Sequence, residues 1–124
     1  MKAKLIGYIS KPSATLRDYP ETDQTIPALY ARAYAYHQNA RVDLALETAD
    51  KLLAKDPDDP YFLELKGQVL LESGRPRESL EPLRRATDLT NSEPLIASLF
   101  GHALIATEDK SNYEEAERVL RAAV

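Results

Sequence analysis

Small residues recur at a fixed interval along the chain, and this interval limits the folds that the sequence can adopt. Ala33, Gly67 and Gly101 are spaced 34 residues apart, and Pro60 recurs as Pro94 at the same interval. A constant period of this length is typical of helix pairs stacked into a repeat array. The sequence therefore predicts an all-α fold of stacked helix pairs.

The period divides the chain into an N-terminal segment and three predicted helix pairs. The segment covers residues 1–25, and the pairs cover residues 26–59, 60–93 and 94–124. In the central pair, Pro60 and Pro76 suit the first positions of two helices, and Gly74 suits the left-handed residue between them. We expect Ala33, Gly67 and Gly101 to lie where the helices of each pair cross, opposite Ala45, Ser79 and Ala116.

The ends of the helices follow from their polar residues. Asp59 is a good N-cap ahead of Pro60, and Asn39 tolerates the left-handed conformation in the first turn. The third pair holds three extra residues between positions 107 and 112, after which Ser111 or Asn112 is expected to cap the last helix. Pro82 lies inside a predicted helix and should bend it.

The N-terminal segment does not fit the period. We expect two helical turns over Lys2–Ile9 and a further turn over Ser13–Arg17, followed by a polar loop. Two interpretations stay open: a helical cap on the first pair, which a solenoid needs for solubility, or the end of a preceding domain. At the other end, Val119, Leu120 and Val124 are expected to be uncovered, as in an excised piece of a longer protein.

Composition excludes several classes of partner. The net charge is −4, with 16 basic and 20 acidic residues interspersed, which argues against a nucleic-acid ligand. There is no apolar run of 18 residues, so no membrane span is expected. The chain has no cysteine, and its two histidines, His37 and His102, lie in no HExxH or paired HxxxH motif. We therefore predict no catalytic site, no metal site and no cofactor in this chain.

The pattern of small residues resembles the tetratricopeptide (TPR) family, over about residues 26–124. The resemblance implies a right-handed superhelix of three TPR-like helix pairs, in which the first helix of each pair lines a concave protein-binding face. Arg32 and Lys66 depart from the family, which usually has leucine at this seventh position, whereas Phe100 keeps an apolar residue there. The candidate binding residues on the inner rows are Tyr30, Tyr34, His37, Tyr61, Glu64, Gln68, Leu95 and His102.

These rows predict one continuous surface for a protein or an unfolded polypeptide, with Glu64 and Glu72 giving it an acidic rim. The alternative for Tyr30 and Tyr34 is a structural role beneath the N-terminal segment. Another function also stays open for the whole chain, namely a structural module that self-associates through its C-terminal end.

A narrower resemblance is carried by the stretches YPETD, ALYARAYAYH and DPYFLELKGQ. They are similar to the region after the catalytic domain in bacterial periplasmic zinc metallopeptidases of the HExxH gluzincin type. The resemblance implies a substrate- or partner-binding C-terminal module and a periplasmic location. The zinc ligands and general base of such enzymes have no counterpart in this sequence, so the resemblance implies no activity for the chain itself.

Overall fold

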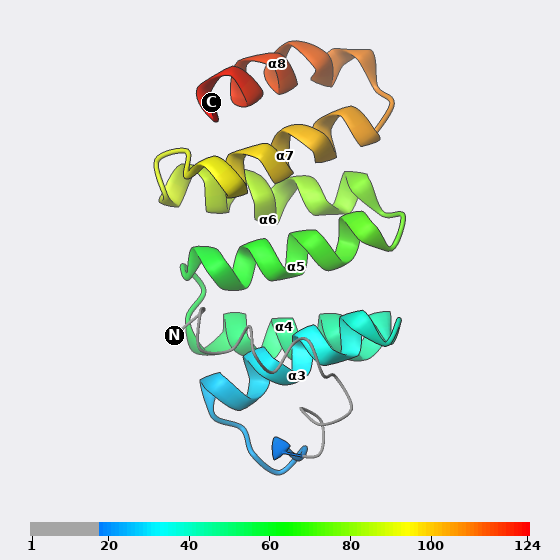
Figure 1. Ribbon diagram of the computed structural model, residues 1–124, viewed down its shortest axis with the longest axis vertical. Helices are drawn as coiled ribbons and strands as arrows, with labels where there is room; N and C mark the ends of the chain where they lie inside the picture. The colour runs from blue at the N-terminus through cyan, green and yellow to red at the C-terminus, as the bar shows by residue number, and fades with distance from the viewer. Residues whose placement is uncertain (1–17) are drawn as a thin grey trace. The chain divides into compact units, whose positions relative to one another are not determined.

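The computed structural model describes residues 18–124 and is helical from Ile26 onward (Figure 1). The elements are α3 (Ile26–Gln38), α4 (Val42–Lys55), α5 (Pro60–Glu72), α6 (Pro76–Leu89), α7 (Pro94–Ala106), the 3₁₀ helix η1 (Lys110–Asn112) and α8 (Tyr113–Ala122). They fall into two compact units: an N-terminal unit that ends at Pro57 and a C-terminal unit, Asp58–Val124. The predicted all-α fold of helix pairs is confirmed. The helical turns expected at 2–9 and 13–17 lie outside the described residues.

A carboxylate followed by a proline starts α5 and α7 of the C-terminal unit. The Asp59 carboxylate accepts hydrogen bonds from the backbone N–H groups of Tyr61 at 2.9 Å and Phe62 at 3.4 Å. One repeat later, Glu93 accepts from the N–H of Ile96 at 3.0 Å. These bonds satisfy N–H groups that have no partner inside the helix. The predicted N-cap at Asp59 is confirmed.

The left-handed residue of the first turn is Ala40, with φ 58°, and not Asn39, whose φ is −89°. The reason is the hydrogen-bond pattern of the turn. The N–H of Arg41 bonds to the carbonyl of Tyr36 at 2.8 Å, and this closure places the left-handed residue immediately before Arg41. The same pattern recurs one repeat later, where Gly74 has φ 81° as expected.

In the N-terminal unit, Arg32 explains one departure from the TPR pattern. Its side chain is buried, and Nη1 donates to the carbonyls of Tyr19 at 3.3 Å, Pro20 at 2.7 Å and Asp23 at 2.6 Å. A leucine at this position offers no donor to those carbonyls. Arg32 therefore anchors the segment before α3 to the helix itself.

Gly67 and Gly101 of the C-terminal unit lie at helix crossings, as predicted. A Cβ atom on Gly67 would lie less than 3.0 Å from the side chain of Leu83, and one on Gly101 would lie as close to Leu120. The residues that approach the glycines are thus these leucines, whereas the sequence suggested Ser79 and Ala116. Ser79 and Ala116 are buried beside them and lie four residues earlier on α6 and α8.

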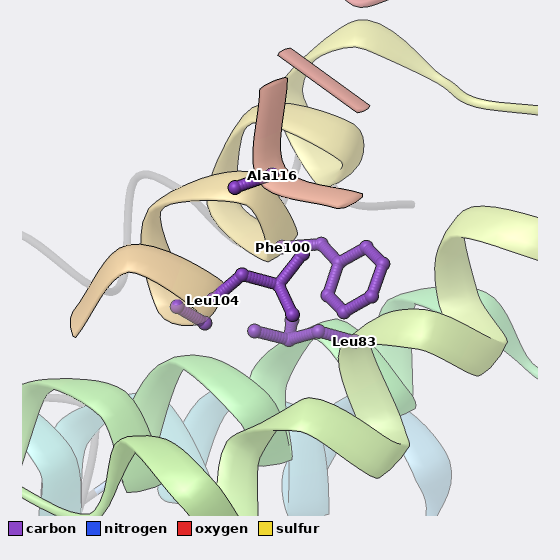
Figure 2. Close-up of a cluster of buried hydrophobic side chains, with 5 residues drawn as sticks. Leu83, Phe100, Leu104 and Ala116 are labelled. Carbon is purple, nitrogen blue, oxygen red and sulfur yellow. The ribbon is translucent and has the colours of Figure 1, made fainter. Parts of the chain in front are cut away.

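One buried apolar cluster of the C-terminal unit joins three helices (Figure 2). Its buried members are Leu83, Phe100, Ala103, Leu104 and Ala116, with Leu71, Leu80, Leu99 and Val119 packed against them. The guanidinium of Arg84 on α6 lies 5.2 Å from the centre of the Phe100 ring, a cation–π distance. Arg84 also pairs with Glu115 of α8 at 2.9 Å, so one side chain connects α6, α7 and α8.

Pro82 and the last linker are two further details of the C-terminal unit, and the bend expected at Pro82 stays a prediction. The helix α6 continues through the buried Pro82 as one element, Pro76–Leu89. In the last linker Asp109 caps the 3₁₀ helix η1 and accepts from the N–H of Ser111 at 3.0 Å. Asn112 occupies the N-cap position of α8, as one of the two expected residues, but its side chain makes no capping hydrogen bond. Asn112 donates instead to the Thr107 hydroxyl at 2.9 Å. The three extra residues therefore form the η1 turn, which has its own cap.

Candidate protein-binding surface

The candidate surface of the C-terminal unit is formed by α5 and α7, which lie next to each other. Residues four apart on a helix share a face, and α5 and α7 each bury another face in the core. On the remaining faces Tyr61 is 41% exposed and Leu95 is 73% exposed. His102 is also exposed, and Gln68 is partly buried. These four predicted residues are on adjacent helices of one unit.

Glu64 differs from its neighbours in the same row. Only 7% of its surface is exposed, so its carboxylate offers little to a ligand at the surface. Glu72, at the C-terminal end of α5, is exposed. The acidic character of this face therefore comes from Glu72 and not from Glu64.

The predicted residues of the N-terminal unit lie on α3. Tyr30 is 4% exposed, whereas Tyr34 and His37 are partly buried. The rings of Tyr30 and Tyr34 are 5.1 Å apart with an interplanar angle of 56°, so they pack as a tilted pair. Tyr30 is therefore buried beside another aromatic ring, as the alternative of a structural role expects for this residue. That all three rows form one continuous surface stays a prediction.

A second apolar surface lies between α7 and α8. It is a groove of about 560 Å³ lined by Ile105, Tyr113, Ala116, Glu117, Leu120, Arg121 and Val124. Leu120 and Val124 were predicted to be uncovered, whereas Tyr113 was not. Val119 was predicted to be uncovered as well, but it is partly buried against the core cluster of Leu83, Phe100, Ala103, Leu104 and Ala116. The sequence feature that could have identified Tyr113 is its position at the start of the last helix, directly after the linker that carries the three extra residues.

Two carboxyl groups have perturbed acidity, and both belong to turns. The pKa of Asp23 is lowered by hydrogen bonds from the backbone N–H and the hydroxyl of Thr25, at 3.1 Å and 2.8 Å. The pKa of Asp109 is lowered by the hydroxyl of Ser111 at 2.7 Å and by its N–H. Hydrogen bonds to the charged form cause both shifts. Both carboxylates therefore stabilise loops.

Within residues 18–124, no group of three or more His, Asp or Glu side chains is placed to hold a metal ion. Over the same residues, the helices are too short and too polar for any of them to span a bilayer.

Comparison with known protein families identifies the family to which this chain belongs. A family model described as "Anaphase-promoting complex, cyclosome, subunit 3" matches residues 38–123, which is more than half of the chain. The chain belongs to this family. The matched residues of this chain run from the end of α3 through α8 and include all of the C-terminal unit except Val124.

Among solved structures, the chain is similar to "MamA MSR-1 C2", with a TM-score of 0.67 and 16% sequence identity. The match covers 96% of this chain and 71% of the other. At this identity the likeness shows the fold, and it confirms the expected TPR-like architecture. No curated protein matches the chain.

Proposed function

We propose that this chain is a non-catalytic protein-binding module and that the face formed by α5 and α7 receives a polypeptide. The observation that carries the proposal is the exposure of Tyr61 and Leu95 on two adjacent helices. Large exposed apolar side chains beside polar groups are typical of recognition surfaces. Membership of a family with TPR-like architecture supports the same class of function, because such modules generally mediate protein interactions.

The chemistry of this face favours certain ligands. Tyr61 offers a broad contact area with few rotatable bonds, and its hydroxyl group can bond to a backbone group. Leu95 adds an apolar contact, and Glu72 adds a negative charge at the end of α5. The ligand is therefore an extended or helical segment of neutral or basic character.

The double variant Tyr61→Ala/Leu95→Ala tests this proposal. Both side chains are exposed, so we expect a change in unfolding free energy of no more than about 0.5 kcal/mol for each substitution. Affinity for fluorescent, reduced and carbamidomethylated lysozyme, a basic unfolded polypeptide, should fall about tenfold by fluorescence anisotropy. Equally treated lactalbumin, which is acidic, should bind the wild-type chain more weakly.

The matched control is Leu89→Ala, which removes an exposed leucine from α6. Its affinity should equal that of the wild type. A double variant that folds and binds lysozyme unchanged would place the ligand site elsewhere. Circular dichroism of each variant separates loss of binding from loss of structure.

A finer proposal concerns the context of the module: the substrate- or partner-binding region of a periplasmic zinc metallopeptidase. Its support is the resemblance of YPETD, ALYARAYAYH and DPYFLELKGQ to such proteins. The direct test is the genomic reading frame that encodes these residues. An upstream HExxH motif supports this context, and a complete frame without one contradicts it.

A further inference from the structure

A polar pocket lies inside the N-terminal unit, between α3, α4 and the segment that precedes α3. Its volume is about 330 Å³, a size suited to a small molecule. Its lining includes Glu21 of that segment, Arg32 and Tyr36 of α3, and Leu44, Glu47 and Lys51 of α4. Because Tyr61 and Leu95 do not line it, the pocket is a separate site from the α5–α7 face.

The guanidinium of Arg32 has donors that the described part of the chain does not use. Arg32 is 3% exposed, and the hydrogen bonds that it makes within residues 18–124 all come from Nη1. A guanidinium has five N–H donors, of which Nη1 carries two. The donors on Nε and Nη2 therefore stay available to a ligand in the pocket that Arg32 lines.

No carboxylate among residues 18–124 forms an ion pair with Arg32. The carboxylate of Asp23 accepts from Thr25, and that of Glu47 lies 3.7 Å from the ammonium of Lys51. Residues 1–17 include no Asp or Glu, so they bring no carboxylate side chain to the pocket. A buried charge without a contacting counter-charge is costly, and an anion bound in the pocket lowers that cost.

The chemistry of the lining selects the anion. Nε and Nη2 of an arginine present two parallel N–H groups, which match the two oxygens of a carboxylate or phosphate. Glu21 and Glu47 disfavour a phosphate dianion, because their own negative charges repel it. Arg32 and Lys51 balance these two acids, so the lining has no net charge. A ligand with one carboxylate and one amino group fits this balance.

We propose that the pocket binds a free α-amino acid with a neutral side chain. Its carboxylate lies against Nε and Nη2 of Arg32, and its amino group faces Glu21 and Glu47. Leu44 and the ring of Tyr36 supply apolar contacts for its side chain. The assignment does not depend on the α5–α7 face, so binding of a polypeptide there can fail without affecting it.

The first test compares three probes with the same side chain by calorimetric titration of the full 124-residue chain. L-leucine carries both charged groups, leucinamide lacks the carboxylate, and 4-methylpentanoate lacks the amino group. Leucinamide should bind at least about tenfold more weakly than leucine, because it cannot form the charge-assisted pair with Arg32. Equal affinities for leucine and leucinamide, or no binding of leucine by the folded chain, would overturn the proposal.

The second test changes the acid that faces the amino group. Glu47→Gln should weaken leucine binding about two- to fivefold, since the side chain is largely exposed. The same variant should bind 4-methylpentanoate at least as tightly as the wild type, because it removes a charge that repels a carboxylate. Asp43→Asn is the matched control, an exposed acid of α4 outside the pocket, and should change neither affinity. Equal losses for both probes in Glu47→Gln would contradict the assigned orientation.

The third test places the ligand at Arg32. Arg32→Lys keeps the positive charge but lacks the paired N–H groups, so leucine affinity should fall about tenfold or more. Because Arg32 also holds residues 19–23, the wild-type chain is followed as well by ¹H–¹⁵N NMR of its arginine side chains. Leucine should shift the signals that disappear in Arg32→Lys. Shifts confined to other residues, or an equal shift with acetate, would overturn the assignment of an amino-acid site.

Discussion

The seventh position of the repeat shows how one residue changes the role of a helix. Leucine is usual there in TPR proteins, but Arg32 uses its guanidinium to hold the carbonyls of residues 19, 20 and 23. Phe100, at the same position of α7, fills the core beneath Arg84. The sequence revealed the departure at Arg32 but not its purpose, because backbone carbonyls leave no mark in a side-chain pattern.

The close helix crossing at Gly67 leads to a prediction about stability. Gly67→Leu should destabilise the chain by at least about 1–3 kcal/mol, because its side chain would overlap Leu83. The urea midpoint, followed by circular dichroism, measures the change. The control Ala54→Leu adds a leucine to an exposed position of α4 and should have little effect. A Gly67→Leu midpoint equal to that of the wild type would contradict the close helix crossing.

At the scale of elements, local residues predicted where helices begin better than how they end. Proline and a preceding carboxylate specify the start of α5 directly. The left-handed residue after α3 was assigned to Asn39 from its intrinsic tolerance, but hydrogen bonding of the turn places it at Ala40. In the last linker Asn112 stands at the N-cap position of α8, but its side chain donates to Thr107 and makes no capping bond, and Asp109 starts a separate 3₁₀ turn.

Asp109 makes the stability of that linker depend on pH. Its pKa is lowered from 3.8 in the folded chain, so its carboxylate stabilises the fold above the unfolded-state pKa. This contribution is lost as the pH falls through the lowered pKa. Asp109→Asn should therefore be less stable than the wild type at pH 7, and the difference in urea midpoint should disappear in strong acid.

The neighbouring variant Glu108→Gln is the control for charge alone. It removes one negative charge but leaves the hydrogen bonds from Ser111 to Asp109 in place. The difference in urea midpoint between Glu108→Gln and the wild type should not show the pH dependence expected for Asp109→Asn. If Asp109→Asn differs from the wild type equally at pH 7 and in acid, the hydrogen bonds do not depend on the carboxylate charge.

For the molecule as a whole, periodicity predicted which helix face each residue occupies but not how deeply it is buried. Leu95 and His102 are exposed on α7 as the repeat indicated, whereas Tyr30 and Glu64, assigned by the same count, are buried. Depth depends on neighbouring side chains, which a single helix period does not encode. The α7–α8 groove likewise becomes apparent only when two helices are placed together.

The division into two units leads to a prediction about independent folding. The C-terminal unit contains both glycine crossings, the core around Phe100, the Arg84–Glu115 pair and the pair of Arg85 with Asp58. Because these interactions are all internal to it, we expect the fragment of residues 58–124 to be helical and to unfold in one cooperative transition. Circular dichroism during thermal unfolding measures both properties. Gly67→Leu in the fragment should lower or abolish the transition, whereas a wild-type fragment without helical signal would show that this unit requires the preceding residues.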